Sequence, residues 1–220
     1  MDSKVVNKEI KKIVWKELKE LGFSHFTSRV AWRYLSDRIE IFEIRSFNKY
    51  KADGAKVTTF SFMLELGVHL LYVPYTVSVK AKNGALLPSV AECKFRGSIE
   101  PSLEFQSTKD PYIWSIDEKG GNVNSCIEDV KSKLPLVLQW FSQFERRENV
   151  LNILLNGSER MNQLSGFGRN PSPIRSYLLG YVALSMGNQS LAEEKLQEAV
   201  NSGCFAYSFL SLEEALSKAL

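Results

Sequence analysis

Apolar residues recur every three or four positions in the first part of the chain, among lysines and glutamates. This spacing places them on one face of a helix, so the sequence predicts an amphipathic helix over residues 4–21. Gly22 is expected to end it, because glycine readily takes the left-handed conformation that follows many helices. The apolar positions are Val6, Ile10, Ile13, Val14, Leu18 and Leu21.

Beyond Gly22 the period of the pattern changes to two, which is the period of a β-strand. The first two strands are expected to form a hairpin across a turn at Ser36 and Asp37, and residues 48–55 are expected to be a polar loop. The alternation predicts antiparallel strands at residues 28–34, 38–47, 59–68, 91–99 and 112–116.

The helical period returns in the second half of the chain. It predicts a helix over residues 124–144, bent or divided by Pro135, and a short helix over residues 149–155. The pattern of apolar residues over 173–200 predicts a helical hairpin around Gly187, followed by a short closing helix. The hairpin has the spacing of one tetratricopeptide repeat; because a solenoid needs about three repeats, a single hairpin packed on the main domain is favoured.

Together these segments predict an α+β protein, with an N-terminal helix, an antiparallel sheet of about 4–6 strands and a C-terminal helical region. Residues 1–156 are expected to form the α+β domain. Residues 157–172 are rich in Ser, Asn, Gly and Pro and are expected to be a linker. Residues 173–220 are expected to form the helical hairpin and the short terminal helix.

Composition agrees with a folded protein, since 44% of the 220 residues are hydrophobic and 24% are charged. No apolar stretch reaches the length of about 18 residues that a membrane span needs, and the start of the chain lacks a signal-peptide pattern. We therefore expect a cytoplasmic protein without membrane contact. The formal net charge of +3 is too small to indicate a polyanion partner by itself.

Candidate chemistry is sparse. The sequence contains no nucleotide-binding, hydrolase or metal-site motif, and its three cysteines show no paired spacing. His25 and His69 have no acid or cysteine at a diagnostic offset. The glycine-containing segment at residues 166–170 is interpreted as a flexible loop rather than a phosphate-binding turn. We expect no cofactor, no metal and no catalytic residues, so an enzyme is not favoured.

The most suggestive surface is the polar face of the predicted sheet, where basic side chains of adjacent strands could align beside tryptophans and bind an anion. The alternative is an ordinary solvated face, whose cations are neutralised by Glu43, Glu65 and Glu92. The candidate binding residues are Arg29, Arg33, Arg45, Lys94, Arg96, Trp32 and Trp114.

Several short segments resemble one known family. They are the run Lys-Lys-Ile-Val-Trp-Lys-Glu-Leu-Lys-Glu-Leu-Gly-Phe that ends at Phe23, the Ala31-Trp32-Arg33 strand end, residues 39–47, Leu66-Gly67-Val68, and residues 93–96. Over residues 8–155 the pattern is similar to the domain of unknown function 4304 family, which is mostly bacterial and has no established activity. The resemblance implies a helix-first α+β domain without catalytic residues. By analogy with small bacterial immunity-type proteins, it is compatible with a partner-binding role.

We therefore expect a bacterial, non-enzymatic protein of the immunity or regulatory type, which binds a protein partner through the sheet face or the helical hairpin. One alternative is an enzyme or small-molecule binder with a pocket between sheet and helices, holding His25 or His69 beside a buried carboxylate. Another is nucleic-acid binding through the basic sheet face.

Overall fold

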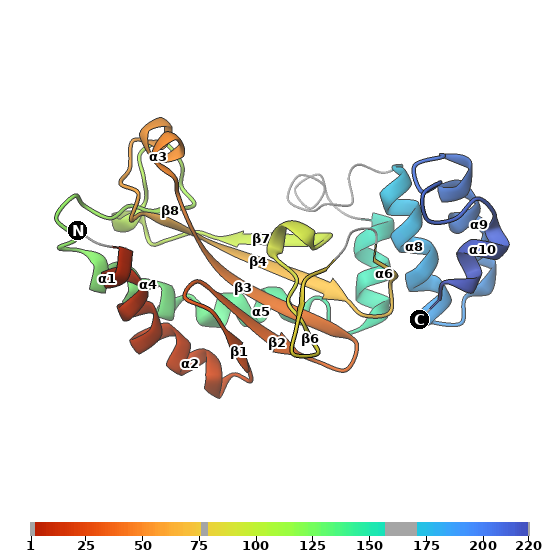
Figure 1. Ribbon diagram of the computed structural model, residues 1–220, viewed down its shortest axis with the longest axis horizontal. Helices are drawn as coiled ribbons and strands as arrows, with labels where there is room; N and C mark the ends of the chain where they lie inside the picture. Colours follow the sequence, from red (N-terminus) through yellow and green to blue (C-terminus); the bar gives the residue numbers. More distant parts are fainter. Residues whose placement is uncertain (1–2, 76–78, 157–170, 220) are drawn as a thin grey trace. The chain divides into compact units, whose positions relative to one another are not determined.

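The computed structural model describes residues 3–75, 79–156 and 171–219 and has an α+β architecture (Figure 1). An N-terminal helix is followed by an antiparallel sheet and then by C-terminal helices, as the sequence predicted. Most of the predicted linker at residues 157–172, including the glycine-containing segment at 166–170, lies outside the described residues. The predicted division into residues 1–156 and 173–220 stays a prediction.

The chain folds into two compact units, each drawn from three separate stretches. The first unit contains Met1–Tyr34, Glu40–Gly67 and Gly97–Trp140. The second contains Leu35–Ile39, Val68–Arg96 and Phe141–Leu220. Three strands of the sheet contribute residues to both units.

The main sheet has the strand order β1-β2-β3-β4-β7, and β8 pairs with β4 off this path. All five predicted strands are present, each shorter than the pattern indicated, and residues 91–92 of the strand predicted at 91–99 belong to a 3-10 helix instead. A separate two-stranded sheet is formed by β5 (Ala81–Lys82) and β6 (Ala85–Leu86). The strands of the main sheet are β1 (His25–Phe26), β2 (Val30–Tyr34), β3 (Arg38–Ser46), β4 (Phe62–Leu70), β7 (Phe95–Ile99) and β8 (Ile113–Trp114).

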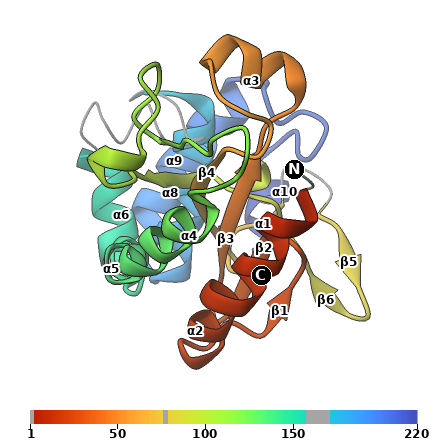
Figure 2. The same ribbon diagram turned by 90° about the vertical axis from the view of Figure 1, so that its left-hand side faces the viewer.

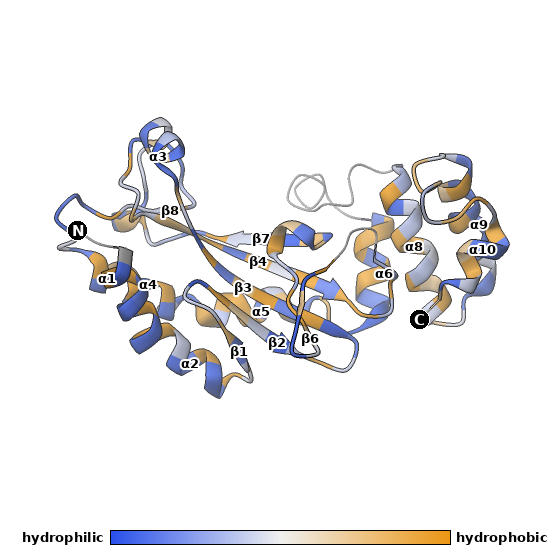
Figure 3. Cartoon of the chain, in the orientation of Figure 1, coloured by the Kyte–Doolittle hydropathy of each residue, from blue (hydrophilic) through white to orange (hydrophobic). Residues whose placement is uncertain are grey.

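The predicted N-terminal helix consists of α1 (Ser3–Glu9), a π-helical turn η1 (Ile10–Val14) and α2 (Trp15–Glu20). The Trp15 N–H donates to the carbonyl oxygen of Ile10, so the wide turn continues directly into α2. Figure 3 shows the helix striped with hydrophobic and hydrophilic residues, as the periodicity predicted.

Gly22 ends this helix with a φ of +89°. Its N–H donates to the Lys19 carbonyl oxygen at 3.1 Å, and the N–H of Phe23 donates to the Leu18 carbonyl oxygen at 3.0 Å. This is the Schellman arrangement, in which glycine fills the left-handed position without strain. The predicted helix end is confirmed.

The helix predicted over residues 124–144 is divided, as one of the two predicted outcomes, into α4 (Val123–Ser132) and α5 (Leu134–Ser142), and Pro135 stands in the first turn of α5. Proline is tolerated there because the first N–H groups of a helix have no partner within it. Figure 2 shows α4 beside the N-terminal helix, and the two pack together. Gly97 of β7 lies under Trp140 of α5, where an added Cβ would come within 2.5 Å of the indole Nε1.

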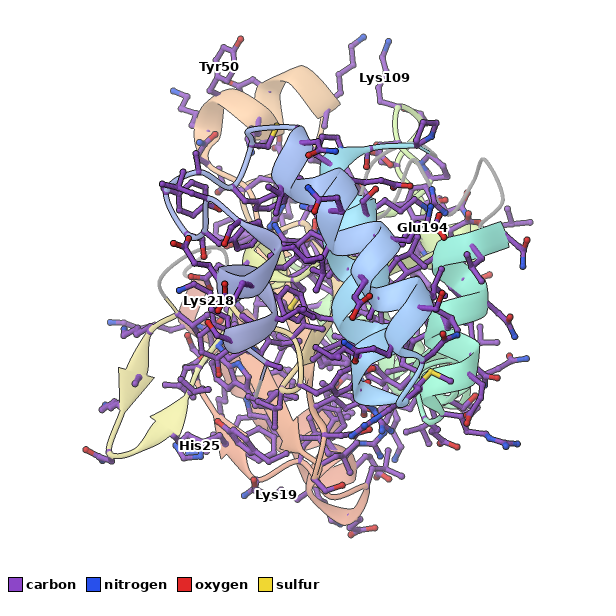
Figure 4. The ribbon with its side chains drawn as sticks, turned by 90° about the vertical axis from the view of Figure 1, so that its right-hand side faces the viewer. Lys19, His25, Tyr50, Lys109, Glu194 and Lys218 are labelled. Atoms are coloured by element: carbon purple, nitrogen blue, oxygen red, sulfur yellow. The ribbon has the colours of Figure 1, made fainter. Side chains whose placement is uncertain are left out.

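One predicted loop is a helix. Residues 48–55 were expected to be irregular, but α3 spans Lys49–Ala55. The Asn48 side chain accepts a hydrogen bond from the Lys51 N–H at 2.9 Å, and Lys56, in the left-handed conformation at φ 54°, ends the helix. Tyr50 points outward from α3 (Figure 4).

The second unit contains α6 (Arg147–Asn156), α8 (Pro173–Ser185), α9 (Gln189–Asn201) and α10 (Leu212–Ser217). The helical hairpin of α8 and α9 is present around Gly187, whose φ is +75°. At Gly180 an added Cβ would lie 2.5 Å from Leu196 Cγ, so the two helices approach closely through a residue without a side chain. Short 3-10 helices in the described part of the chain are η2 (Val90–Glu92) in this unit and η3 (Leu103–Phe105) in the first.

In the part of the chain that the structure describes, no helix combines the length and the hydropathy that crossing a membrane requires.

Candidate functional site

Arg33, a candidate from the sequence, lies on the face of the sheet that the N-terminal helix covers. Its Nε donates to Glu40 Oε2 at 2.7 Å, and its Nη1 donates to the Leu21 carbonyl oxygen at 3.1 Å. The guanidinium also stands over the ring of Phe23, 5.3 Å from its centre. Because Glu40 is fully buried, Arg33 serves to neutralise it and to tie the end of α2 to the sheet.

Arg45 lies on the opposite face of β3, since it is five positions after Glu40 on an alternating strand. Its Nη2 is 2.9 Å from a carboxylate oxygen of Glu65, and its Nε is 3.8 Å from Glu43. This matches the neutralised, solvated face that the sequence left open as an alternative. Arg33 and Arg45 therefore do not share one basic face.

The two tryptophans belong to the core rather than to a binding surface. Trp32 is 5% exposed. Trp114 is fully buried, stacks on Phe62 with ring centres 5.5 Å apart, and donates from Nε1 to Asp129 at 2.8 Å. Neither indole is available as an exposed stacking platform.

The other predicted cations are partly buried. Burial lowers the pKa of Arg29, and its Nη1 has no hydrogen-bond partner in the described part of the chain. Lys94 and Arg96 are near neighbours in the second unit: burial lowers the pKa of Lys94, and the charge of Arg96 lowers it further. The structure thus groups Lys94 with Arg96 but does not gather all five cations on one open face.

The two histidines and three cysteines are dispersed. His25 of β1 is exposed and contacts Tyr34, whereas His69 of β4 is buried. The three cysteines are free thiols, buried at Cys93 and Cys126 and exposed at Cys204. Among residues 3–75, 79–156 and 171–219, no group of three His, Cys, Asp or Glu side chains is arranged to hold a metal ion.

The most distinctive surface of the first unit is a groove of about 590 Å³ beside the N-terminal helix. One wall is the helix and the other is the turn between β1 and β2. We call it the lysine groove. It is lined by Lys4, Asn7, Lys8, Lys11, Trp15, Lys19, Phe26, Thr27 and Ser28.

The spacing of the helix residues explains the groove. Lys4, Lys8 and Lys11 are separated by four and three positions, so they lie along one face of the helix. Trp15 and Lys19 continue the series at steps of four. The π-helical turn η1, which contains Lys11 and ends just before Trp15, adds a residue to one turn of the helix, and the same stripe still lines the groove on both sides of it.

Among the described residues, no carboxylate lines the lysine groove. Two of the glutamates of the helix have partners elsewhere: Glu9 is 3.6 Å from Lys12, and Glu17 is 2.8 Å from Lys131 of α4. In the described part of the chain, no ion pair engages Lys8, Lys11 or Lys19. Lys8, Lys11 and Lys19 therefore bring positive charge to the groove that no side chain of the described residues neutralises.

Aromatic contacts fix the floor of the groove. Trp15 is 4% exposed, its ring lies 5.6 Å from Phe26 and 5.8 Å from Phe42, and its Nε1 donates to the Thr27 carbonyl oxygen at 2.9 Å. This hydrogen bond holds the β1–β2 turn against the helix. The Lys19 ammonium stands 5.6 Å from the centre of the Phe26 ring, a cation–π distance. Figure 4 shows Lys19 at the surface.

Sequence reasoning missed this site, although part of its signal was available. A helical projection of residues 4–19 separates the four groove lysines from the glutamates. The sequence pattern does not indicate the second wall of the groove, because only the fold brings Phe26 and Thr27 beside the helix.

Comparison of the chain with protein-family models, with curated proteins and with solved structures gave no match. The resemblance to the domain of unknown function 4304 family therefore stays a prediction.

Proposed function

We propose that the protein is a non-enzymatic binding protein that takes up an acidic segment of a partner protein in the lysine groove. The observation that carries the proposal is a groove lined, among the described residues, by four lysines and no carboxylate. This keeps the partner-binding role of the immunity or regulatory type expected from the sequence, but moves the binding surface from the sheet face to the N-terminal helix.

The aromatic residues favour a polypeptide over a single-stranded nucleic acid. Sequence-tolerant nucleic-acid grooves stack bases on exposed aromatic rings. Here Trp15 is buried, and the Lys19 ammonium stands over the ring of Phe26, so neither ring is open to a base. The net charge of +3 is also low for a nucleic-acid-binding domain.

The walls of the groove suit a segment that alternates acidic and apolar side chains. Lysine stems offer apolar surface while their ammonium groups stay in water, so they contact both kinds of side chain. Asn7 keeps a buried side-chain oxygen without a hydrogen-bond partner among the described residues. A peptide backbone has N–H donors that would satisfy such an oxygen, whereas a phosphodiester has none.

The test is fluorescence anisotropy with a labelled peptide of alternating glutamate and leucine. The groove variant is Lys8→Glu with Lys11→Glu. The matched control is Lys12→Glu with Lys16→Glu, which makes the same change of net charge on the same helix at exposed positions outside the groove. Circular dichroism verifies that both variants fold.

We expect the groove variant to bind the peptide about tenfold or more weakly than the wild type, and the control variant to bind nearly as well as the wild type. The affinity should fall as salt is raised. Equal losses in the two variants would show a non-specific effect of net charge and overturn the proposal. Tighter binding of an oligothymidylate of the same length would overturn it in favour of nucleic acid.

A further inference from the structure

A small pocket in the second unit lies between the end of β4, the segment from η2 to β7, and α8. It has a volume of about 40 Å³. This exceeds the space that one water needs, but it limits any occupant to a few non-hydrogen atoms. Its polar lining residues are His69, Glu92 and Lys94, and its apolar walls include Tyr75, Tyr177 and Leu178.

His69 has an unmet hydrogen-bonding capacity. The side chain is 8% exposed, and its buried Nε2 has no hydrogen-bond partner within residues 3–75, 79–156 and 171–219. Its ring lies 5.0 Å from that of Tyr75. Burial lowers the pKa of His69 and the carboxylate of Glu92 opposes this shift, which favours a neutral imidazole at pH 7. Buried polar atoms are normally paired, so an unpaired one calls for an explanation.

Lys94 lines this pocket, and Arg96, two residues further along the chain, is close enough for its charge to act on Lys94. No ion pair engages Lys94 in the described part of the chain. Arg96 has a buried Nε without a hydrogen-bond partner there. Burial and the charge of Arg96 both lower the pKa of Lys94. Two like charges that are partly removed from water and have no hydrogen-bond acceptor are unfavourable. An anion beside them would accept hydrogen bonds and offset the repulsion.

Glu92 does not supply that anion. Its Oε2 accepts from the Ser89 N–H at 2.6 Å and from the Ser89 hydroxyl at 2.7 Å, as part of the capping box of η2. The carboxylate is thereby fixed in place. Its negative charge makes the pocket less favourable for a dianion such as phosphate than for a monoanion.

We propose that this pocket binds a small monocarboxylate with a short apolar tail. The carboxylate accepts hydrogen bonds from Lys94 at the His69 end of the pocket, and the tail lies against the walls formed by Tyr75, Tyr177 and Leu178. The size of the pocket favours a chain of about four carbons over a long-chain fatty acid. The site lies entirely in the second unit and does not depend on the lysine groove.

The test uses sodium butyrate and the ring signals of the two histidines in a proton–nitrogen correlation spectrum. His25 lies in the first unit and is exposed, so it is an internal control. We expect butyrate to shift the His69 signals along a saturable curve and to leave those of His25 unchanged. The titrations are run at pH 8, where inorganic phosphate is mainly dianionic. Neither 1-butanol, which lacks the charge, nor phosphate, which has no tail, should reproduce the shift.

Lys94→Met keeps most of the side-chain stem and removes the charge; Lys109→Met, at an exposed position of the first unit (Figure 4), is the matched control. We expect Lys94→Met to weaken butyrate binding about tenfold or more and Lys109→Met to have no effect. Equal shifts of both histidines, or an equal response to phosphate, would overturn the proposal. These comparisons use the wild-type protein alone, so they hold even if a variant fails to fold. The Lys8→Glu/Lys11→Glu variant should bind butyrate like the wild type, so this proposal and the proposed function fail separately.

Discussion

Arg175 of α8 caps the end of α6 by donating a hydrogen bond from its buried Nε to the carbonyl oxygen of Leu154. Its Nη2 donates to the neighbouring carbonyl oxygen of Ile153 at 3.2 Å. The last carbonyl groups of a helix lack partners within it and carry partial negative charge, so a buried cation there is well placed. Arg147, at the start of α6, donates in turn to the carbonyl oxygen of Ser185 at the end of α8.

We expect Arg175→Met to lower the free energy of unfolding by about 2–3 kcal/mol, because it leaves buried carbonyl groups without donors. Urea unfolding followed by circular dichroism measures the change. Arg146→Met is the control: this neighbour of α6 has a side chain that is 75% exposed, so we expect a change within about 0.5 kcal/mol. Similar effects of the two substitutions would contradict the capping role.

Gly180→Ala tests the close approach of α8 and α9. Since a Cβ at this position would meet Leu196 at 2.5 Å, we expect the unfolding free energy to fall by about 1–3 kcal/mol. Gly54→Ala in α3 is the opposite case, because no atom lies within 4 Å of the added Cβ. There the better helix propensity of alanine should stabilise the protein by about 0.5–1 kcal/mol. Opposite signs in the two denaturation curves are the expected result.

Asp129 is a buried carboxylate that organises the core of the first unit. It accepts from Trp114 Nε1 at 2.8 Å, from the Ser102 N–H at 3.0 Å and from the Ser102 hydroxyl at 2.6 Å. Asp129→Asn removes the negative charge that strengthens these hydrogen bonds, and it places the amide NH2 group against other hydrogen-bond donors. We therefore expect the free energy of unfolding to fall by about 2–3 kcal/mol. Glu128→Gln, at the preceding exposed position, should change stability little. Thermal unfolding of both variants gives the comparison.

Cys126 should make stability fall in alkaline solution. Burial, and then the charges of Asp129 and Asp117, raise the pKa of its thiol from 9.0 to about 12. Between these pH values the unfolded chain loses the thiol proton and the folded chain keeps it, so rising pH favours unfolding. The thiol contributes a slope of up to about 1.4 kcal/mol per pH unit in this window.

Unfolding titrations of wild-type protein and Cys126→Ala from pH 8 to pH 12 measure this contribution. The variant should show the shallower decline above pH 9. Cys204→Ala, which removes an exposed thiol, should follow the wild-type curve. A Cys126→Ala curve parallel to that of the wild type throughout the range would show that the buried thiol does not titrate as expected.

Sequence periodicity predicted the elements whose residues alternate or recur regularly. It located the N-terminal helix, its end at Gly22, the strands and the break at Pro135. It missed α3, because Asp53 and Gly54 have low helix propensity, and the helix depends on the cap at Asn48. It also does not indicate the short hairpin of β5 and β6, which turns at Asn83-Gly84 with both residues at positive φ.

The sites were harder to predict because each joins residues that are distant in the chain. Alternation placed Arg33 and Trp32 on opposite faces of β2, but only the fold shows that the N-terminal helix covers the Arg33 face. His69 and Lys94 are 25 positions apart and become neighbours of one pocket where β4 and β7 pair. Strand order is a property of the whole sheet, and local patterns do not contain it.

The interleaving of the two units limits how the protein can be dissected. Strand β4 passes from the first unit to the second after Gly67, and β7 returns to the first after Arg96. No single chain break separates the units, and a fragment that stops before Pro173 loses Tyr177 and Leu178 from the wall of the pocket. The two proposed binding activities are therefore best assigned by point substitutions in the intact chain, because truncation would damage the framework along with the site.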